Sequence, residues 1–266
     1  MKITMLGTGA AFPDPDRAQS GILVTLDNGS TSLFDCGAGT TPNMVRANTN
    51  PADVTAVFLT HLHHDHICDF PLFAITGWMW DRKIPPIVLG PKGTKNFCNH
   101  LFEGGAFDAD FRARGDYPLR QKNLKAIRPD VREVSPGLCY EDTNVKIYCD
   151  YVEHIPREIT ECYGIRFEAE GKAIAFSGDT KPCDNMIKLA MNVDVLFHEC
   201  TFPESFIEFR RLSGVGTHAH TSPTELGEIA AKAKIKKLVA THFGHFESTN
   251  QVIKNAAKHH MPVDEM

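Results

Sequence analysis

Hydrophobic residues recur along the chain in short runs of alternating or continuous apolar positions, which is the pattern of β-strands. After the opening residues 1–6, strands are predicted at residues 54–60, 145–152, 164–168, 172–177, 193–197 and 237–241. Several of these runs are followed within two residues by a polar residue that binds metals or protons, and those residues are His61, His154, Asp179, Glu199 and His242. Because α/β folds place ligands at strand ends, the pattern predicts one composite site.

Helical signals separate the predicted strands. Residues 222–225 (SPTE) offer an N-cap serine, a proline at the first helical position and a glutamate that can close a capping box. Apolar residues then follow at helical spacing through Ala233. Further helices are predicted near Thr41 and near Asp184. The alternation of strands and helices predicts a layered α/β fold, and the absence of a linker or repeat predicts a single domain over residues 1–266.

Composition and charge restrict the function. The 266 residues include 28 Lys and Arg against 33 Asp and Glu, a net charge of −5, which argues against general binding of polyanions. The eight cysteines form no CxxC pair, so neither a thiolate zinc site nor a thioredoxin-like motif is indicated. The cysteines fit reduced thiols, and the N-terminus fits a strand better than a signal peptide. No apolar run is long enough to span a membrane. These features predict a cytoplasmic protein with no membrane partner.

Histidines are concentrated directly after the strand at residues 54–60. Residues 61–66 (HLHHDH) supply imidazoles and one carboxylate, a ligand set that suits zinc, manganese or iron. A chance cluster of solvated histidines is the alternative, and the position after a strand, with further candidate ligands at other strand ends, argues against it.

The six residues 61–66 resemble the HxHxDH signature of the metallo-β-lactamase superfamily. Further motifs resemble the ribonuclease Z-like and arylsulfatase-like branch of that superfamily, at residues 6–9 (LGTG), 34–40 (FDCGAGT), 89–93 (LGPKG), 198–202 (HECTF), 220–222 (HTS) and 241–243 (THF). The resemblance implies an αββα sandwich and a metal-dependent hydrolase that acts on ester bonds.

The resemblance also implies two divalent metal ions, Zn²⁺ in the first place and Mn²⁺ or Fe²⁺ as alternatives. One ion would be held by His61, His63 and His154, the other by Asp65, His66 and His242, with Asp179 bridging them. Two ions roughly 3.5–4 Å apart lower the pKa of a bridging water, so that a metal-bridging hydroxide attacks the ester without a protein nucleophile.

Three residues are expected to take part in proton transfer. Asp65 would orient or deprotonate the water, His220 would stabilise charge or protonate the leaving oxygen, and Glu199 would fix the tautomer of His220. His64, His198, His218 and His245 are expected to lie behind the ligands or in solvent.

Both tryptophans follow the signature, in an apolar stretch that begins at Phe70. Trp78 and Trp80 fit two interpretations: core packing of a helix beneath the metal-binding loop, or an apolar wall that receives an organic leaving group.

The chain departs from transfer-RNA-processing ribonuclease Z in several places. His154 and Asp179 stand only 25 positions apart, which leaves no room for the protruding arm of that enzyme. Residues 241–246 lack its Arg-Tyr ending, and residues 68–70 (CDF) replace its glycine-rich continuation. Residues 108–133 hold seven Lys and Arg but also five acidic residues, so they form no basic surface for RNA.

The predicted function is therefore hydrolysis of a small organic ester, with a phosphodiester, a sulfate ester and a carboxylic ester or lactone all open. Transfer RNA is disfavoured as a partner, and a homodimer is left open. A ribonuclease Z-type endonuclease that processes RNA 3′ ends is the first alternative. A redox di-iron protein of the same fold is the second, although such proteins typically replace one signature histidine with a carboxylate. An inactive binding module is disfavoured because every ligand position is filled.

Overall fold

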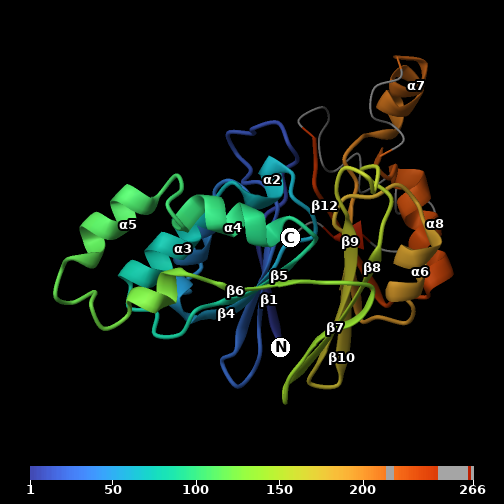
Figure 1. The fold of residues 1–266 in the computed structure, drawn as a ribbon. Helices are drawn as coiled ribbons and strands as arrows, with labels where there is room; N and C mark the ends of the chain where they lie inside the picture. Colours follow the sequence, from blue (N-terminus) through green and yellow to red (C-terminus); the bar gives the residue numbers. More distant parts are fainter. Residues whose placement is uncertain (214–218, 245–262, 265–266) are drawn as a thin grey trace. The chain divides into compact units, whose positions relative to one another are not determined.

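The computed structural model describes residues 1–213, 219–244 and 263–264 (Figure 1). The chain folds into two compact units, the first formed by Met1–Gly7 and Pro15–Val134 and the second by Thr8–Asp14 and Ser135–Met266. Each unit contains one β-sheet. A single domain over residues 1–266 stays a prediction.

The first unit is built on a six-stranded mixed sheet in the order β1-β2-β3-β4-β5-β6. Its strands are β1 (Lys2–Gly7), β2 (Gly21–Thr25), β3 (Thr31–Phe34), β4 (Val54–Phe58), β5 (Ile87–Gly90) and β6 (Asp130–Glu133). The first three pair antiparallel, and β3 to β6 pair parallel. The helical segments of this unit are α1 (Thr40–Arg46), η1 (Pro51–Asp53), α2 (His64–Ile67), α3 (Phe70–Met79), α4 (Thr94–Phe102), α5 (Asp108–Gly115) and η2 (Leu124–Ile127).

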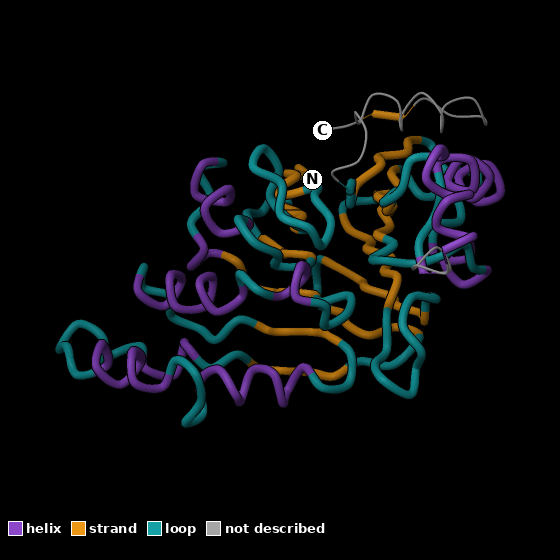
Figure 2. Tube along the Cα trace, turned by 90° about the horizontal axis from the view of Figure 1, so that it is seen from above, coloured by secondary structure: helices purple, strands orange, loops and turns teal. Residues whose placement is uncertain are grey.

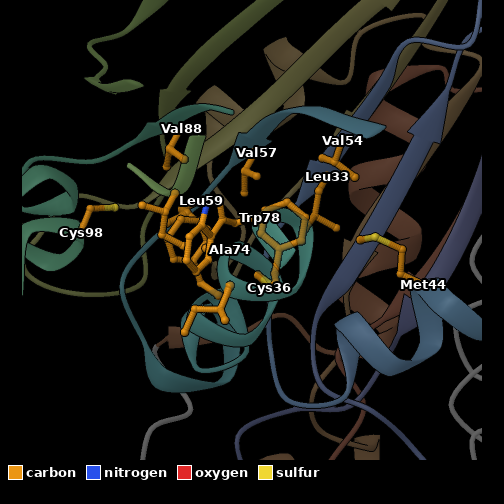
Figure 3. Close-up of a cluster of buried hydrophobic side chains, with 14 of the residues drawn as sticks. Leu33, Cys36, Met44, Val54, Val57, Leu59, Ala74, Trp78, Val88 and Cys98 are labelled. Atoms are coloured by element: carbon orange, nitrogen blue, oxygen red, sulfur yellow. The ribbon is translucent and has the colours of Figure 1, made fainter. Parts of the chain in front are cut away.

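The core of the first unit lies between one face of this sheet and its helices. Alternate strand residues point into it, among them Leu33, Val57 and Val88, where they meet Ala74 and Trp78 of α3 (Figure 3). Trp78 is completely buried, and its indole N–H donates to the carbonyl of Asn123 at 3.1 Å. Of the two interpretations of the tryptophans, core packing is therefore correct for Trp78, whereas Trp80 is 46% exposed.

The second unit is built on a seven-stranded mixed sheet in the order β13-β12-β11-β10-β9-β8-β7. Its strands are β7 (Gly137–Glu141), β8 (Val145–Tyr151), β9 (Tyr163–Ala169), β10 (Lys172–Phe176), β11 (Val195–Glu199), β12 (Lys237–Thr241) and β13 (Val263–Asp264). The strands β7 to β10 pair antiparallel and β10 to β13 parallel. Its helices are α6 (Asp184–Leu189), α7 (Glu204–Ser213) and α8 (Pro223–Ala233).

Helices α6 and α8 lie beside each other along one face of this second sheet (Figures 1 and 2). Their apolar residues, such as Met186, Leu226 and Ile229, pack with Leu196 and Leu238 of the sheet in one buried cluster. The predicted capping box of α8 is present, since the Ser222 side chain accepts from the Glu225 backbone and the Glu225 side chain accepts from the Ser222 backbone. The sheet and its helices together present the strand ends that carry the candidate residues.

The predicted strands and helices are present, with one shift that affects the site. The strand predicted at residues 193–197 is instead β11 (Val195–Glu199). Val193 is buried in the turn before the strand, and the parallel pairing with β12 continues through Glu199. The prediction that His198 and Glu199 follow the strand was therefore wrong, because both lie within it.

No helix in the described part of the chain is both long and apolar enough to cross a membrane.

Candidate active site

In the first unit, the HLHHDH motif begins three residues after the end of β4 at Phe58 and runs into the short helix α2. His61, Asp65 and His66 are buried, whereas His63 is exposed. The His61 ring lies 4.7 Å from the His63 ring and 4.1 Å from the His66 ring, measured between centroids. Nε2 of His66 lies 3.7 Å from Oδ2 of Asp65. The motif thus brings three imidazoles and a carboxylate to one place in this unit.

A buried carboxylate supports this cluster from behind. Oδ2 of Asp35 lies 2.7 Å from Nδ1 of His66, and the same carboxylate accepts from the backbone N–H of Thr60 at 2.8 Å and from its hydroxyl at about 3 Å. Nδ1 of His61 lies 3.1 Å from the Thr60 hydroxyl. A carboxylate cannot donate, so Nδ1 of His66 carries the proton and its Nε2 keeps a free electron pair. Ligand histidines are typically oriented in this way.

Close approach of two loops requires the glycine at position 37. A Cβ at Gly37 would stand 2.0 Å from the carbonyl oxygen of Asp65 and 2.8 Å from the Cβ of Gln19. Any side chain here would push the 34–40 loop away from α2. The loop also binds α2 through its backbone, because the N–H of Cys36 donates to the carbonyl of His66 at 2.7 Å.

In the second unit, Asp179 lies between two histidines at the ends of neighbouring segments. Its Oδ2 is 3.6 Å from Nε2 of His154 and 3.3 Å from Nε2 of His242. Ligand atoms around a tetrahedral zinc ion with bonds of about 2.1 Å lie roughly 3.4 Å apart, so this spacing suits a metal ion bound between them. Gly178, directly before Asp179, adopts a positive φ of 57°, a backbone conformation that favours glycine at this turn.

The protonation of His154 also suits a ligand. Its Nδ1 lies 2.9 Å from the carbonyl oxygen of Ala219, so Nδ1 donates and Nε2 faces Asp179 with its electron pair. Burial lowers the pKa of His154, and the negative charge of Asp179 opposes that shift only in part. The imidazole is therefore neutral at pH 7, which is the form that binds metals.

Glu199 accepts four hydrogen bonds in a completely buried position. Oε1 accepts from Nδ1 of His220 at 2.7 Å and from the N–H of Thr180 at 2.9 Å. Oε2 accepts from the hydroxyl of Thr201 at 2.8 Å and from its N–H at 3.2 Å. Burial would raise the pKa of Glu199, but the charge of His220 and its hydrogen bond outweigh this and lower it. Glu199 is thus an ionised partner of His220, and a surface glutamate is excluded at this position.

His220 lies beside both candidate histidine ligands of its own unit. Its ring centroid is 4.9 Å from that of His154 and 5.8 Å from that of His242. Glu199, His220 and His242 also offer ligand atoms close enough to hold a metal ion. However, Nδ1 of His220 is used by Glu199, and the arrangement favours a proton donor over a third ligand on that nitrogen.

The other histidines differ in their surroundings. His64 is exposed, and His198 is completely buried, with its Nδ1 at 2.9 Å from the carbonyl oxygen of Glu199. Nε2 of His198 has no hydrogen-bond partner in the described structure, and burial lowers the pKa of this imidazole. His218 and His245 lie outside the described residues.

Sequence reasoning missed the roles of Asp35, Thr60 and Thr201. Asp35 and Thr201 stand in motifs that carried the family resemblance, and Thr60 precedes the histidine motif, so their positions were the available signal. Which atoms these side chains would contact depended on the tertiary fold.

Two segments in which the sequence departs from transfer-RNA-processing ribonuclease Z can be followed within the units. Residues 155–178 hold only a loop and the hairpin β9–β10, which turns at Glu170 and Gly171. Within residues 108–133, four of the arginines lie beside carboxylates, in the pairs Arg112–Asp108, Arg114–Asp110, Arg128–Glu103 and Arg132–Asp130. The positive charge of this segment is thereby largely neutralised.

Comparison with known proteins places these residues in a family. The model of the family "Anti-Pycsar protein Apyc1" matches residues 1–261. The ribonuclease Z of Mycobacterium bovis is 30% identical over 249 residues, covering 91% of this chain and 86% of that protein, and that of an Exiguobacterium species is 32% identical over 273 residues, covering 91% and 88%.

Solved structures agree with the sequence comparison. The short form of human tRNase Z is 25% identical, covers 92% of this chain and 93% of its own, and has a TM-score of 0.72. The metallo-β-lactamase fold protein YhfI from Bacillus subtilis, at 20% identity and a TM-score of 0.75, covers 99% of this chain and 95% of its own and supports the fold.

The predicted α/β sandwich of the metallo-β-lactamase superfamily is thereby confirmed, as is a hydrolase that acts on ester bonds. With its HxHxDH motif, its buried Asp179 beside two imidazoles and its Glu199–His220 pair, the chain belongs to the Apyc1 family, within the ribonuclease Z-like branch of metallo-β-lactamase fold, metal-dependent hydrolases.

Proposed function

We propose that the chain hydrolyses a small phosphodiester with the help of two divalent metal ions, most readily Zn²⁺, with Mn²⁺ or Fe²⁺ as alternatives. The single observation that supports the metal centre best is the position of Asp179, whose Oδ2 lies at ligand-to-ligand distance from Nε2 of both His154 and His242. The ligands we assign are His61, His63, Asp65, His66, His154, Asp179 and His242. Bound ions would supply Lewis acidity and a water of lowered pKa.

The protein's own residues then have three tasks. Asp65, next to Nε2 of His66, is assigned to hold the attacking water and accept its proton. His220 is assigned to protonate or stabilise the leaving oxygen through Nε2, since its Nδ1–H is given to Glu199. Glu199 keeps His220 in that tautomer and favours its protonated form.

The choice of ester type follows from the relatives. Proteins that are 30–32% identical over most of the chain are named ribonuclease Z, and a ribonuclease breaks phosphodiester bonds. Among the three ester types left open by the sequence, this favours the phosphodiester. Three features favour a small substrate over RNA. Four arginines of residues 108–133 pair with carboxylates, the interval between His154 and Asp179 is short, and the net charge is −5.

Cleavage of precursor transfer RNA is the second candidate, and the extent of similarity to ribonuclease Z favours it. A panel of substrates separates the two candidates. The zinc-loaded protein is assayed with a nitrophenyl phosphodiester, a small cyclic phosphodiester, a nitrophenyl sulfate, a nitrophenyl carboxylate and a precursor transfer RNA. We expect turnover of the small phosphodiesters and negligible cutting of RNA. Efficient, position-specific cutting at the RNA 3′ end would instead establish the second candidate.

His220 provides a test of the assigned mechanism. His220→Ala should leave metal content unchanged and lower kcat by roughly 10²–10⁴, the usual range for acid–base catalysis. A diester that releases nitrophenolate needs little protonation and should lose less than one that releases an alkoxide. Loss of metal in His220→Ala would make this residue a ligand, and equal loss for both leaving groups would exclude the acid role.

We also propose a cytoplasmic location, supported by eight cysteines that are all free thiols. The homodimer left open by the sequence stays a prediction.

A further inference from the structure

Each unit contains a threonine hydroxyl placed between a buried carboxylate and a histidine to which the proposed function assigns a metal. In the first unit this is Thr60, between Asp35 and His61. In the second unit it is Thr201, between Glu199 and His242. We call these arrangements the Thr60 relay and the Thr201 relay. They occur on different strand ends of different sheets, so they are independent observations.

The Thr60 relay is completely buried from solvent. The Thr60 hydroxyl lies 3.0 Å from Oδ1 and 2.9 Å from Oδ2 of Asp35, and 3.1 Å from Nδ1 of His61. Thr60 is 2% exposed, Asp35 4% and His61 0%. Asp35 is held in a left-handed backbone conformation, with φ of 58°, at the end of β3. A non-glycine residue in this conformation is strained, which is typical of functional positions.

The Thr201 relay has the same chemistry. Its hydroxyl lies 2.8 Å from Oε2 of Glu199 and 2.8 Å from Nδ1 of His242. It is also 3.2 Å from Nδ1 of His220, but that nitrogen has a shorter contact of 2.7 Å with Oε1 of Glu199. His242, like Asp35, adopts a positive φ, of 59°.

Proton counting fixes the direction of every hydrogen bond in both relays. An ionised carboxylate only accepts, and a hydroxyl has a single proton, so each threonine donates to its carboxylate. The hydroxyl oxygen then presents electron pairs to the imidazole, and Nδ1 of His61 and of His242 must donate. The proton of each ring therefore resides on Nδ1, and Nε2 keeps the electron pair that a metal ion requires.

We propose that Thr60 and Thr201 are positioning residues that select the Nδ1–H tautomer of His61 and His242 and hold both rings in place. The proposal rests on the proposed function, because it takes these histidines as metal ligands. His66 and His154 achieve the same tautomer differently, since they donate directly to Asp35 and to the Ala219 carbonyl. The threonines thus extend one buried carboxylate in each unit to a second imidazole.

Removal of each hydroxyl without loss of volume tests the proposal. Thr60→Val and Thr201→Val keep the side-chain shape but leave Nδ1 beside a methyl group, so neither tautomer is preferred. Groups that orient metal ligands contribute about 10–100-fold to affinity or activity. We expect each valine variant to bind Zn²⁺ roughly 10–100-fold more weakly by chelator competition, and Thr60→Ser and Thr201→Ser to restore most of the affinity.

Thr94→Val is the matched control. Thr94 is also completely buried, and its hydroxyl donates to the carbonyl of Pro91 at 2.7 Å without contact to a histidine in the described hydrogen bonds. This variant loses the same group and should retain the zinc affinity of the parent protein. If it weakens zinc binding as much as the other two valine variants, their effect comes from lower stability and the proposal is overturned.

A direct observation of the tautomers keeps the test independent of the variants' folding. Long-range ¹H–¹⁵N correlation spectra of the parent protein should show protonated Nδ1 for His61 and His242. Nε2–H in either ring would refute the relay in that unit. If the tautomers are as proposed and zinc binding is tight but no phosphodiester is cleaved, the proposed function fails while this inference stands. Valine variants that bind zinc with unchanged affinity would overturn the inference alone.

Discussion

Replacement of Glu199 by glutamine tests whether the buried, ionised carboxylate stabilises the second unit. The carboxylate accepts four hydrogen bonds, two from the backbone N–H groups of Thr180 and Thr201, one from the Thr201 hydroxyl and one from His220. Glutamine offers one acceptor oxygen and two donor hydrogens. Whichever way the amide is placed, at least one buried backbone N–H faces another donor.

The magnitude follows from these contacts. A buried N–H without a partner costs about 1–3 kcal/mol, and hydrogen bonds to an ionised group contribute about 1 kcal/mol more than neutral ones. We therefore expect Glu199→Gln to lower the free energy of unfolding by about 2–5 kcal/mol. Activity should fall by roughly 10–100-fold, because His220 loses the charge that orients it and favours its protonated form.

Urea denaturation and steady-state kinetics on the same preparation provide the assay, with Glu141→Gln as the control. Glu141 pairs with Lys146 at 2.9 Å, and both side chains are about half exposed, at 47% and 52%. The same chemical change there should cost less than about 1 kcal/mol, as exposed ion pairs do. Equal stability losses in the two variants would refute the argument that Glu199 is a saturated, buried acceptor.

Three further changes are predicted from the structure. Asp179→Ala should reduce the metal content from two equivalents towards one, measured by elemental analysis after reconstitution with Zn²⁺. Trp78→Ala should lower the free energy of unfolding by about 3–5 kcal/mol, as large core deletions do, whereas the change at half-exposed Trp80 should cost less than about 1 kcal/mol. Burial lowers the pKa of His198, so the unfolded chain takes up a proton before the folded chain does as the pH falls below about 6.5. The free energy of unfolding should therefore decline there by up to about 1.4 kcal/mol per pH unit. His198→Leu should remove that part of the pH dependence, measured by urea denaturation at pH 7 and pH 5.5.

Much of the site could be predicted because its residues occupy positions with strong local signals. His154, Asp179 and His242 each follow an apolar run that forms a strand, and the structure places their side chains together within the second unit. The pairing of Glu199 with His220, expected from the family resemblance, is present at 2.7 Å. The helix at α8 followed from its capping box, which is a purely local arrangement.

The rest depended on tertiary contacts that local patterns do not contain. The apolar run near Val193 begins before its strand, because Val193 packs in the core cluster from a turn, so the start of β11 was shifted by two residues. Trp78 lies in the last turn of α3, whereas Trp80 directly follows the end of that helix at Met79, and only Trp78 is buried. Because α3 is apolar on nearly every side, its sequence gives no indication of whether Trp78 faces the core.

The proposed hydrolase needs two metal ions per chain. The most direct test is the rate of hydrolysis of a nitrophenyl phosphodiester as metal-free protein is titrated with Zn²⁺, with bound metal measured at each point. We predict that the rate is negligible without metal, rises with added zinc and reaches its plateau at close to two bound equivalents per chain. A plateau at one equivalent, or full turnover by the metal-free protein, would contradict a two-metal hydrolase.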